Sequence, residues 1–342
     1  MAYTTINKST DYFNTKLYTG DGNNARAITG VGFQPDFTWL KTRNDTQSHQ
    51  LFDAVRGATK NLHSNTNGAE ATYSDALQSF NSDGFTIGTS GGINGSGDTV
   101  AAWNWKANGA GSSNTDGTIT SSVSANTTAG FSIVSYTGTG ANATVGHGLG
   151  SVPRMIIVKR RDGSDDWLVQ HGSLGSGKAL NLNSTGTVQT YDPYWNATEP
   201  TTSVFSIGND GRTNGSSETY IAYCFAEKKG YSKIGSYTSN NNANGTFVYT
   251  GFKPSFIILK NTSSGGTAWH LYDNKRLGYN VDNNYLFPNS DTSEATADQI
   301  DILSNGFKLR YVGDNNNGSD NIIYMAFGQS LVGSNNVPCT AR

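Results

Sequence analysis

Residues 18–41 read YTGDGNNARAITGVGFQPDFTWLK, and two later stretches follow the same pattern: YTGTGANATVGHGLGSVPRMIIVK at 136–159 and YTSNNNANGTFVYTGFKPSFIILK at 237–260. In all three, a proline follows the opening tyrosine by 17 residues, and a lysine follows that proline by six. A strongly apolar run separates the proline from the lysine. Agreement at fixed spacing over 24 residues indicates a tandem array of one structural unit.

The apolar runs predict buried β-strands. They are rich in β-branched and aromatic residues and too short for convincing helices, and a preceding proline is compatible with a strand start. A second apolar run ends each unit and follows an Asn-Gly turn, which supplies the positive φ that a tight hairpin needs. The first runs occupy 37–41, 155–159 and 256–260, and the second runs occupy 100–105, 220–225 and 322–327.

The composition is that of an all-β protein without a nucleic-acid partner. Charged residues make up 15% of the chain, against about 25% in ordinary globular proteins, and 24 basic and 26 acidic residues leave a net charge of −2. A basic footprint for nucleic acid is therefore missing from the sequence. Glycine, serine, threonine and asparagine supply the polarity and favour turns, whereas 17 tyrosines and 15 phenylalanines suit strands.

Together these patterns predict an all-β fold of three tandem antiparallel β-sandwich or jelly-roll-like units, with about six strands in each. The predicted units span 1–107, 131–229 and 230–342, the last ending in a short C-terminal tail. Segment 108–130 begins in a Gly/Ser/Asn-rich stretch and is predicted to be a flexible linker and lead-in. The second junction has little slack, so we expect the second and third units to pack together and the first to be more independent.

The candidate ligand-binding residues lie in a loop of the second unit that reads TYDPYWNATE from position 190. Tyr191, Tyr194 and Trp195 would form a sugar-stacking platform, because aromatic rings offer broad apolar faces at low entropic cost. Asp192 and Glu199 add two carboxylates to this set. Two alternatives stay open: the rings fold down over the edge of the sandwich, or the carboxylates form the catalytic pair of a glycosidase.

No catalytic residue, metal site or cofactor is predicted. The five histidines are never at the short spacings of a metal-binding motif. His49 and His270 fall in equivalent strands, which favours a structural role. Residues 173–178 contain glycines and a lysine but are too short for a nucleotide-binding loop. We therefore expect a protein that is not an enzyme.

Secretion and membrane insertion are also not expected. The chain opens into polar sequence without a basic or apolar signal region, and no window approaches 18 apolar residues. Cys224 lies in an apolar run and Cys339 near the end, so the two cysteines define no disulfide framework. Cys224 is predicted to be a small buried apolar side chain.

Several phrases resemble a repeat family of marine bacteriophages, notably those of cyanobacteria and other abundant ocean bacteria. The phrases are MAYTTINKS at 1–9, YTG at 18–20, GFQPDF at 32–37, LFDAVRG at 51–57 and YIAYCFA at 220–226. Members of that family are described as tail-fibre-like or other virion appendage proteins of unknown function. The resemblance covers nearly the whole chain and implies a setting without a mechanism. It implies synthesis in the host cytoplasm, assembly on the virion and contact with other virion proteins.

In that setting the leading prediction is a tail-fibre-like adhesin that binds a glycan or receptor on the host cell surface. A purely structural virion component is the alternative, as a capsid decoration, fibre segment or tail subunit. A glycan depolymerase is the second alternative. A homo-oligomer is expected, with a trimer among the states considered.

Overall fold

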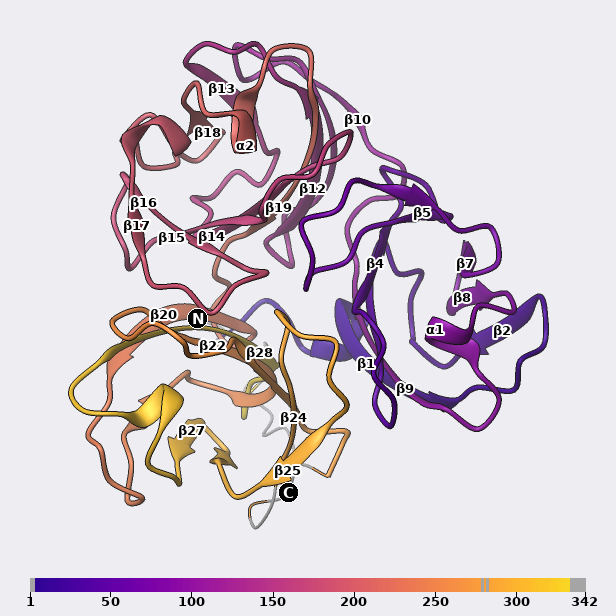
Figure 1. Cartoon of the computed structure of the whole chain (residues 1–342), viewed down its shortest axis with the longest axis vertical. Helices are drawn as coiled ribbons and strands as arrows, with labels where there is room; N and C mark the ends of the chain where they lie inside the picture. The colour runs from indigo at the N-terminus through magenta and orange to yellow at the C-terminus, as the bar shows by residue number, and fades with distance from the viewer. Residues whose placement is uncertain (1–3, 278–279, 281–282, 333–342) are drawn as a thin grey trace.

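The computed structural model describes residues 4–277, 280 and 283–332 and confirms the predicted all-β class (Figure 1). Within these residues, 28 strands accompany two one-turn helices, α1 (Gly91–Asn94) and α2 (Gly211–Asn214), and three short 3-10 turns. The turns are η1 (Ser9–Asp11), η2 (Asp192–Tyr194) and η3 (Asp314–Asn316). All strand pairs between named strands are antiparallel. Figure 1 shows three lobes around a common centre.

The first lobe pairs a four-stranded sheet, β1-β9-β3-β4, with a three-stranded sheet, β2-β8-β7, and adds the short pair β5-β6. Its strands are β1 (Phe13–Thr19), β2 (Arg26–Thr29), β3 (Phe37–Thr42), β4 (Gln50–Asp53), β5 (Lys60–Asn61), β6 (Ala71–Thr72), β7 (Leu77–Asn81), β8 (Gly84–Ile87) and β9 (Thr99–Trp105).

The second lobe has an eight-stranded sheet, β10-β11-β12-β19-β14-β15-β16-β17, and a two-stranded sheet, β13-β18. Its strands are β10 (Ser112–Asn114), β11 (Ser121–Asn126), β12 (Phe131–Thr137), β13 (Ala143–Gly146), β14 (Met155–Arg160), β15 (Leu168–His171), β16 (Lys178–Asn181), β17 (Gln189–Thr190), β18 (Val204–Ile207) and β19 (Thr219–Phe225).

The third lobe has a six-stranded sheet, β20-β28-β22-β23-β24-β25, and a three-stranded sheet, β21-β27-β26. Its strands are β20 (Ser232–Thr238), β21 (Phe247–Tyr249), β22 (Lys253–Asn261), β23 (His270–Asp273), β24 (Asn283–Leu286), β25 (Ala295–Ala297), β26 (Ile300–Leu303), β27 (Gly306–Leu309) and β28 (Asn321–Gln329).

The large sheets share one local strand order: β1-β9-β3-β4, β12-β19-β14-β15 and β20-β28-β22-β23. The apolar runs predicted to be buried strands are the two central strands of each series, paired on both sides. Their continuous hydrophobicity fits a strand that is covered on both faces. The derivation of the lobes from three copies of one unit, with the boundaries given above, stays a prediction.

Each large sheet buries both faces, which gives the molecule four hydrophobic clusters. Along β9, Val100 and Ala102 face a cluster shared with the small sheet of the first lobe, whereas Trp103 and Trp105 face a central cluster. This alternation follows from the two-residue period of a strand. The central cluster takes residues from the large sheets of all three lobes.

Two expectations about the chain's organisation are corrected. Segment 108–130, predicted to be a flexible linker, contains β10 and β11, which extend the large sheet of the second lobe. The first lobe is not more independent than the others, because its Trp105 ring lies 5.4 Å from that of Phe256 in the third lobe. Its Phe37 ring also stacks on Tyr223 of the second lobe, with 4.3 Å between centroids.

Two of the three junctions between lobes carry a network of arginines and carboxylates. Glu70 of the first lobe pairs with Arg161 of the second, and Glu294 of the third lobe pairs with Arg43 of the first. At the third junction, Leu174, Val188 and Thr262 line a hollow of about 320 Å³.

In the part of the chain that the structure describes, no helix has the length and apolar character needed to cross a membrane.

Candidate functional site

The loop predicted to bind a ligand is divided between the surface and the core. Tyr191 is 46% exposed, and Asp192 and Glu199 are exposed as well. Tyr194 and Trp195 are buried, and Trp195 has no exposed surface at all. A sugar cannot stack on a buried ring, so the three-ring platform is reduced to Tyr191. The structure instead fits the alternative in which the rings fold down over the sandwich.

The rings of Tyr194 and Trp195 fill the core of the second lobe, whose small sheet has two strands. In the first and third lobes the small sheet has three strands, but β13 and β18 stand as a pair in the second. Tyr194 and Trp195 join the cluster between the second lobe's sheets. Their position is fixed further by the Tyr194 hydroxyl, which donates to Gln189 Oε1 at 2.7 Å, and by the Arg212 guanidinium, 4.4 Å from the Tyr194 ring centroid. These residues serve packing.

The end of the same loop borders a hollow of about 210 Å³ in the surface of the second lobe. Glu199 and Pro200 form one side of it, and the segment that enters β14 forms another with Val152, Pro153 and Arg154. Gln170 of β15 also lines the hollow. The walls therefore combine apolar proline and valine surfaces with a carboxylate, a guanidinium and a carboxamide.

Gln170 is the most unusual residue of this hollow. The residue is 3% exposed, yet neither its amide oxygen nor its amide nitrogen has a hydrogen-bond partner among the residues that the structure describes. Burying a polar group without a partner costs about 1–3 kcal/mol. An unpartnered buried amide at the edge of a hollow is therefore an available donor and acceptor for a bound molecule.

The strand register shows how position 170 differs from its equivalents in the other two lobes. Gln170 pairs with Ile156, and the residues at the same register in the other lobes are Phe52 opposite Thr38 and Tyr272 opposite Ile257. Both aromatic rings are buried. The second lobe thus has a smaller, polar side chain where the other two have a ring.

Arg154 reaches the hollow across Gly172. A methyl group at position 172 would lie 2.8 Å from the guanidinium carbon of Arg154, so glycine leaves the room that this side chain occupies. Arg154 is exposed and forms no ion pair with any residue that the structure describes. Its hydrogen-bond donors are available, as is the carboxylate of Glu199.

This set of groups suits a polyhydroxylated ligand. A sugar hydroxyl both donates and accepts, so adjacent hydroxyls match the guanidinium donors, the carboxylate acceptors and the two-sided amide of Gln170. A few converging polar groups in a partly apolar concavity are typical of small-molecule sites. Of the predicted site residues, Glu199 belongs to the hollow, while Tyr191 lies beside Tyr194, with ring centroids 4.9 Å apart.

Sequence reasoning missed Arg154 and Gln170. The available signal was the glutamine itself, which interrupts the apolar face of a strand where the other two copies carry an aromatic residue. Aligning the units on Trp167 and Trp269 would have revealed that difference.

The three lysines that follow the apolar runs are structural. Lys41, Lys159 and Lys260 are buried, and their amines donate to backbone carbonyls of Thr42 at 2.6 Å, Arg160 at 2.6 Å and Thr267 at 2.7 Å. Burial lowers the pKa of each to about 8. Each amine therefore holds nearby backbone carbonyls, that of Lys260 also reaching the Thr185 carbonyl of the second lobe at 3.3 Å, and is not presented to a ligand.

The chain matches one family of proteins over residues 8–330, described as a domain of unknown function, DUF7483. It belongs to this family. No curated protein matches the chain. The family match shows one domain over nearly the whole chain, and it assigns no ligand or activity to that domain. Among the residues that the structure describes, no group of three or more histidine, cysteine, aspartate or glutamate side chains is placed to hold a metal ion.

Proposed function

We propose that this protein is a surface protein of a bacteriophage virion that binds a glycan of the host cell envelope. The hollow formed by Arg154, Gln170 and Glu199 would hold the sugar. The observation that carries the proposal is the Gln170 carboxamide, which is buried at the hollow with neither polar atom partnered.

The buried Gln170 amide destabilises the protein when no ligand is bound. An amide buried without partners costs about 1–3 kcal/mol, and a ligand hydroxyl that donates to its oxygen or accepts from its nitrogen would offset that cost. A fold under selection for stability alone would favour the aromatic residues found at this register in the other lobes. The polar residue is therefore better explained by a bound partner than by packing.

The resemblance to marine phage appendage proteins supports the choice of a host glycan. A protein displayed on a virion meets the polysaccharides of the cell envelope first, and an exposed concave site suits a flexible chain of sugars. The exposed Tyr191 ring, on the same loop as Glu199, would extend the contact along such a chain.

Binding of purified protein to host envelope polysaccharide, measured by calorimetry and on a glycan array, tests the proposal. Gln170→Leu should abolish or strongly weaken binding while leaving the protein as stable as the wild type or more stable, because it removes an unpartnered buried amide. Gln78→Leu, at a half-buried site of the first lobe, is the control and should bind as the wild type does.

Unchanged affinity of Gln170→Leu would disprove the assignment of this site. Absence of binding by the wild-type protein to any host polysaccharide would disprove the glycan-binding function itself. The polysaccharide should keep its chain length after incubation with the protein, whereas shortening would favour a depolymerase.

A purely structural role is the second candidate, and the shared central cluster favours it. Large sheets from all three lobes pack around one hydrophobic core, which suits a rigid tile on a particle surface. Deleting the gene separates the two candidates. Particles that assemble normally but fail to adsorb would support the adhesin, and particles that adsorb but are unstable would support the structural component.

A further inference from the structure

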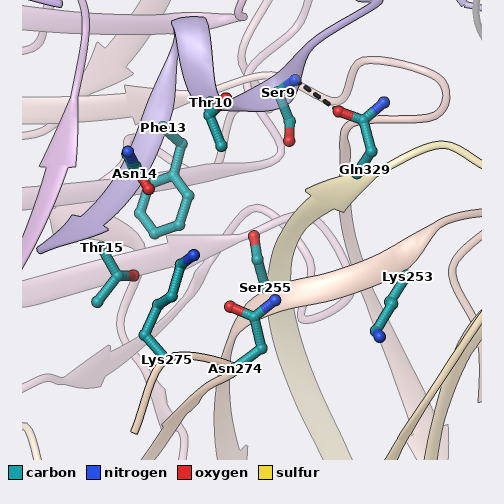
Figure 2. Close-up of a pocket in the computed structure, with 10 residues that line it drawn as sticks. All are labelled: Ser9, Thr10, Phe13, Asn14, Thr15, Lys253, Ser255, Asn274, Lys275 and Gln329. Atoms are coloured by element: carbon teal, nitrogen blue, oxygen red, sulfur yellow. Dashed lines mark hydrogen bonds between the residues drawn. The ribbon is translucent and has the colours of Figure 1, made fainter. Parts of the chain in front are cut away.

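A second hollow, of about 160 Å³, lies between the first and third lobes, far along the chain from the glycan site proposed above (Figure 2). The first lobe contributes the turn η1 and the start of β1, and the third lobe contributes β22 and the residues after β23. The backbone N–H of Ser9 donates to Gln329 Oε1 at 2.7 Å and ties η1 to the end of β28 at the rim.

Two polar atoms at this hollow have no partner. Thr15, on the edge strand β1, is 7% exposed, and its hydroxyl has no hydrogen-bond partner in the described part of the chain. The side-chain oxygen of Asn274 is likewise buried and unpartnered. A hydroxyl can donate and accept, whereas a carboxamide oxygen can only accept. The hollow therefore presents one hydroxyl that can both donate and accept, and one carbonyl oxygen that needs a donor from a bound molecule.

The charged groups around the hollow are positive. Among the described residues, its charged lining residues are Lys253 and Lys275, and no described aspartate or glutamate lines it. Figure 2 shows the Lys275 side chain reaching into the space between Phe13 and Ser255. An ammonium group beside unpartnered neutral groups favours an anion that also carries hydrogen-bond donors.

We propose that this hollow binds a sugar acid of monosaccharide size. Its carboxylate would accept from the Lys275 ammonium, a ring hydroxyl would donate to Asn274 Oδ1, and a second hydroxyl would pair with Thr15 Oγ1. Neutral sugars lack the carboxylate, and simple inorganic oxyanions lack the hydroxyl donors, so neither satisfies all the groups present.

Titration of the full chain with glucuronate, followed by calorimetry and by ligand-observed NMR, tests this proposal. Glucuronate should bind at least about tenfold more tightly than glucose, since a hydrogen bond to a charged group is worth more than a neutral one. Added salt should weaken glucuronate binding and leave glucose unaffected. Inorganic sulfate should bind more weakly than glucuronate.

Variants assign the binding to this hollow. Lys275→Met should weaken glucuronate binding about tenfold or more, and Thr15→Val should weaken it while leaving the thermal unfolding temperature unchanged or higher. Lys60→Met, which removes an amine of β5 that does not line this hollow, and Gln170→Leu, in the other hollow, should bind glucuronate as the wild type does.

Equal affinity for glucose and glucuronate, equal affinity for sulfate and glucuronate, or unchanged binding by Lys275→Met would each overturn the proposal. Comparing glucuronate with a glucuronate-containing polysaccharide then identifies the source. Competition by the polysaccharide at matched sugar concentration would point to an acidic glycan, and its failure to compete would point to a free sugar acid.

Discussion

Arg43 and Glu294 lie 251 residues apart in sequence and form a two-pronged ion pair across the junction of the first and third lobes. The Arg43 Nη2 and Nε atoms lie 2.7 Å and 3.0 Å from the two carboxylate oxygens of Glu294. Glu294 also accepts from Arg276 at 2.8 Å, and Arg276 in turn pairs with the buried Asp273. The Glu294 carboxylate therefore contacts two arginines and joins two lobes, and Asp273 supplies the second negative charge of the network.

Replacing that carboxylate should destabilise the whole molecule. In Glu294→Gln, the fully buried Arg276 side chain loses one of its two carboxylate partners, and Arg43 loses its only ion pair among the described residues. Breaking a buried pair by removing one partner costs about 3 kcal/mol. Urea unfolding should show this loss, and Glu70→Gln should show a similar one.

The control for both is Glu199→Gln, which changes an exposed carboxylate that has no ion pair in the described part of the chain. Its effect should stay within about 0.5 kcal/mol. A loss of stability in Glu294→Gln no larger than in this control would contradict the role given to the junction.

Stability should fall as the pH drops below about 6.5. Burial lowers the pKa of all five histidines, and those of His171 and His270 fall to about 4. In the unfolded chain a histidine takes up its proton near pH 6.5. Between pH 6.5 and 4 the unfolded state therefore binds more protons than the folded state, and acid favours unfolding.

Each buried histidine should remove up to about 1.4 kcal/mol per pH unit in that window. Urea unfolding at pH 7, 6 and 5 measures the slope. His171→Gln should reduce it, because glutamine does not titrate. A free energy of unfolding that is constant from pH 6.5 to 5 would show that these side chains are protonated in the folded protein.

Raising the pH above about 8 should at first increase the stability of the protein. Burial lowers the pKa of Lys41, Lys159 and Lys260 to about 8, whereas an unfolded lysine keeps its proton to about pH 10.4. Between these values the unfolded state binds more protons, so the free energy of unfolding rises with pH. Above about pH 10 the buried tyrosines reverse this trend, because burial raises their pKa and only the unfolded state loses those protons.

Urea unfolding at pH 8, 9, 10 and 11 should therefore pass through a maximum near pH 10. Lys159→Met should flatten the rise, whereas Lys60→Met should not change it. A steady decline from pH 8 upward would contradict the assignment of low pKa values to the three buried amines.

The strands that sequence predicts best are those whose signal is local. β3 and β9 are buried on almost every position of both faces, and the apolar residues along each already predict a strand inside a sheet. β10 and β11 lie in segment 108–130, which is predicted to be a linker and lead-in because it begins in a Gly/Ser/Asn-rich stretch. Backbone pairing to an existing sheet edge stabilises such strands, and composition does not report it.

The candidate site was only partly predictable for a related reason. The aromatic loop was visible as a difference between the units, but the burial of Tyr194 and Trp195 depends on space left by a small sheet with two strands. The role of Gln170 becomes visible only from the strand register, which places it opposite Ile156. Both facts are long-range and cannot be derived from the loop sequence alone.

A methyl group at either of two glycines should separate binding from stability. In Gly172→Ala the new atom would press on the Arg154 guanidinium at 2.8 Å, and the flexible end of that side chain can move away. In Gly208→Ala it would lie 2.0 Å from the carbonyl oxygen of Pro193, where only backbone movement relieves the contact. Overpacking of this kind costs about 1–3 kcal/mol.

We therefore expect Gly172→Ala to keep the wild-type free energy of unfolding within about 0.5 kcal/mol and to lose glycan affinity, because Arg154 is displaced from the hollow. Gly208→Ala should lose stability and, measured below its unfolding temperature, keep its affinity. Calorimetric binding and urea unfolding on the two variants make the comparison. If Gly172→Ala binds host polysaccharide as the wild type does, Arg154 does not contact the sugar, and the hollow must recognise it through Gln170 and Glu199 alone.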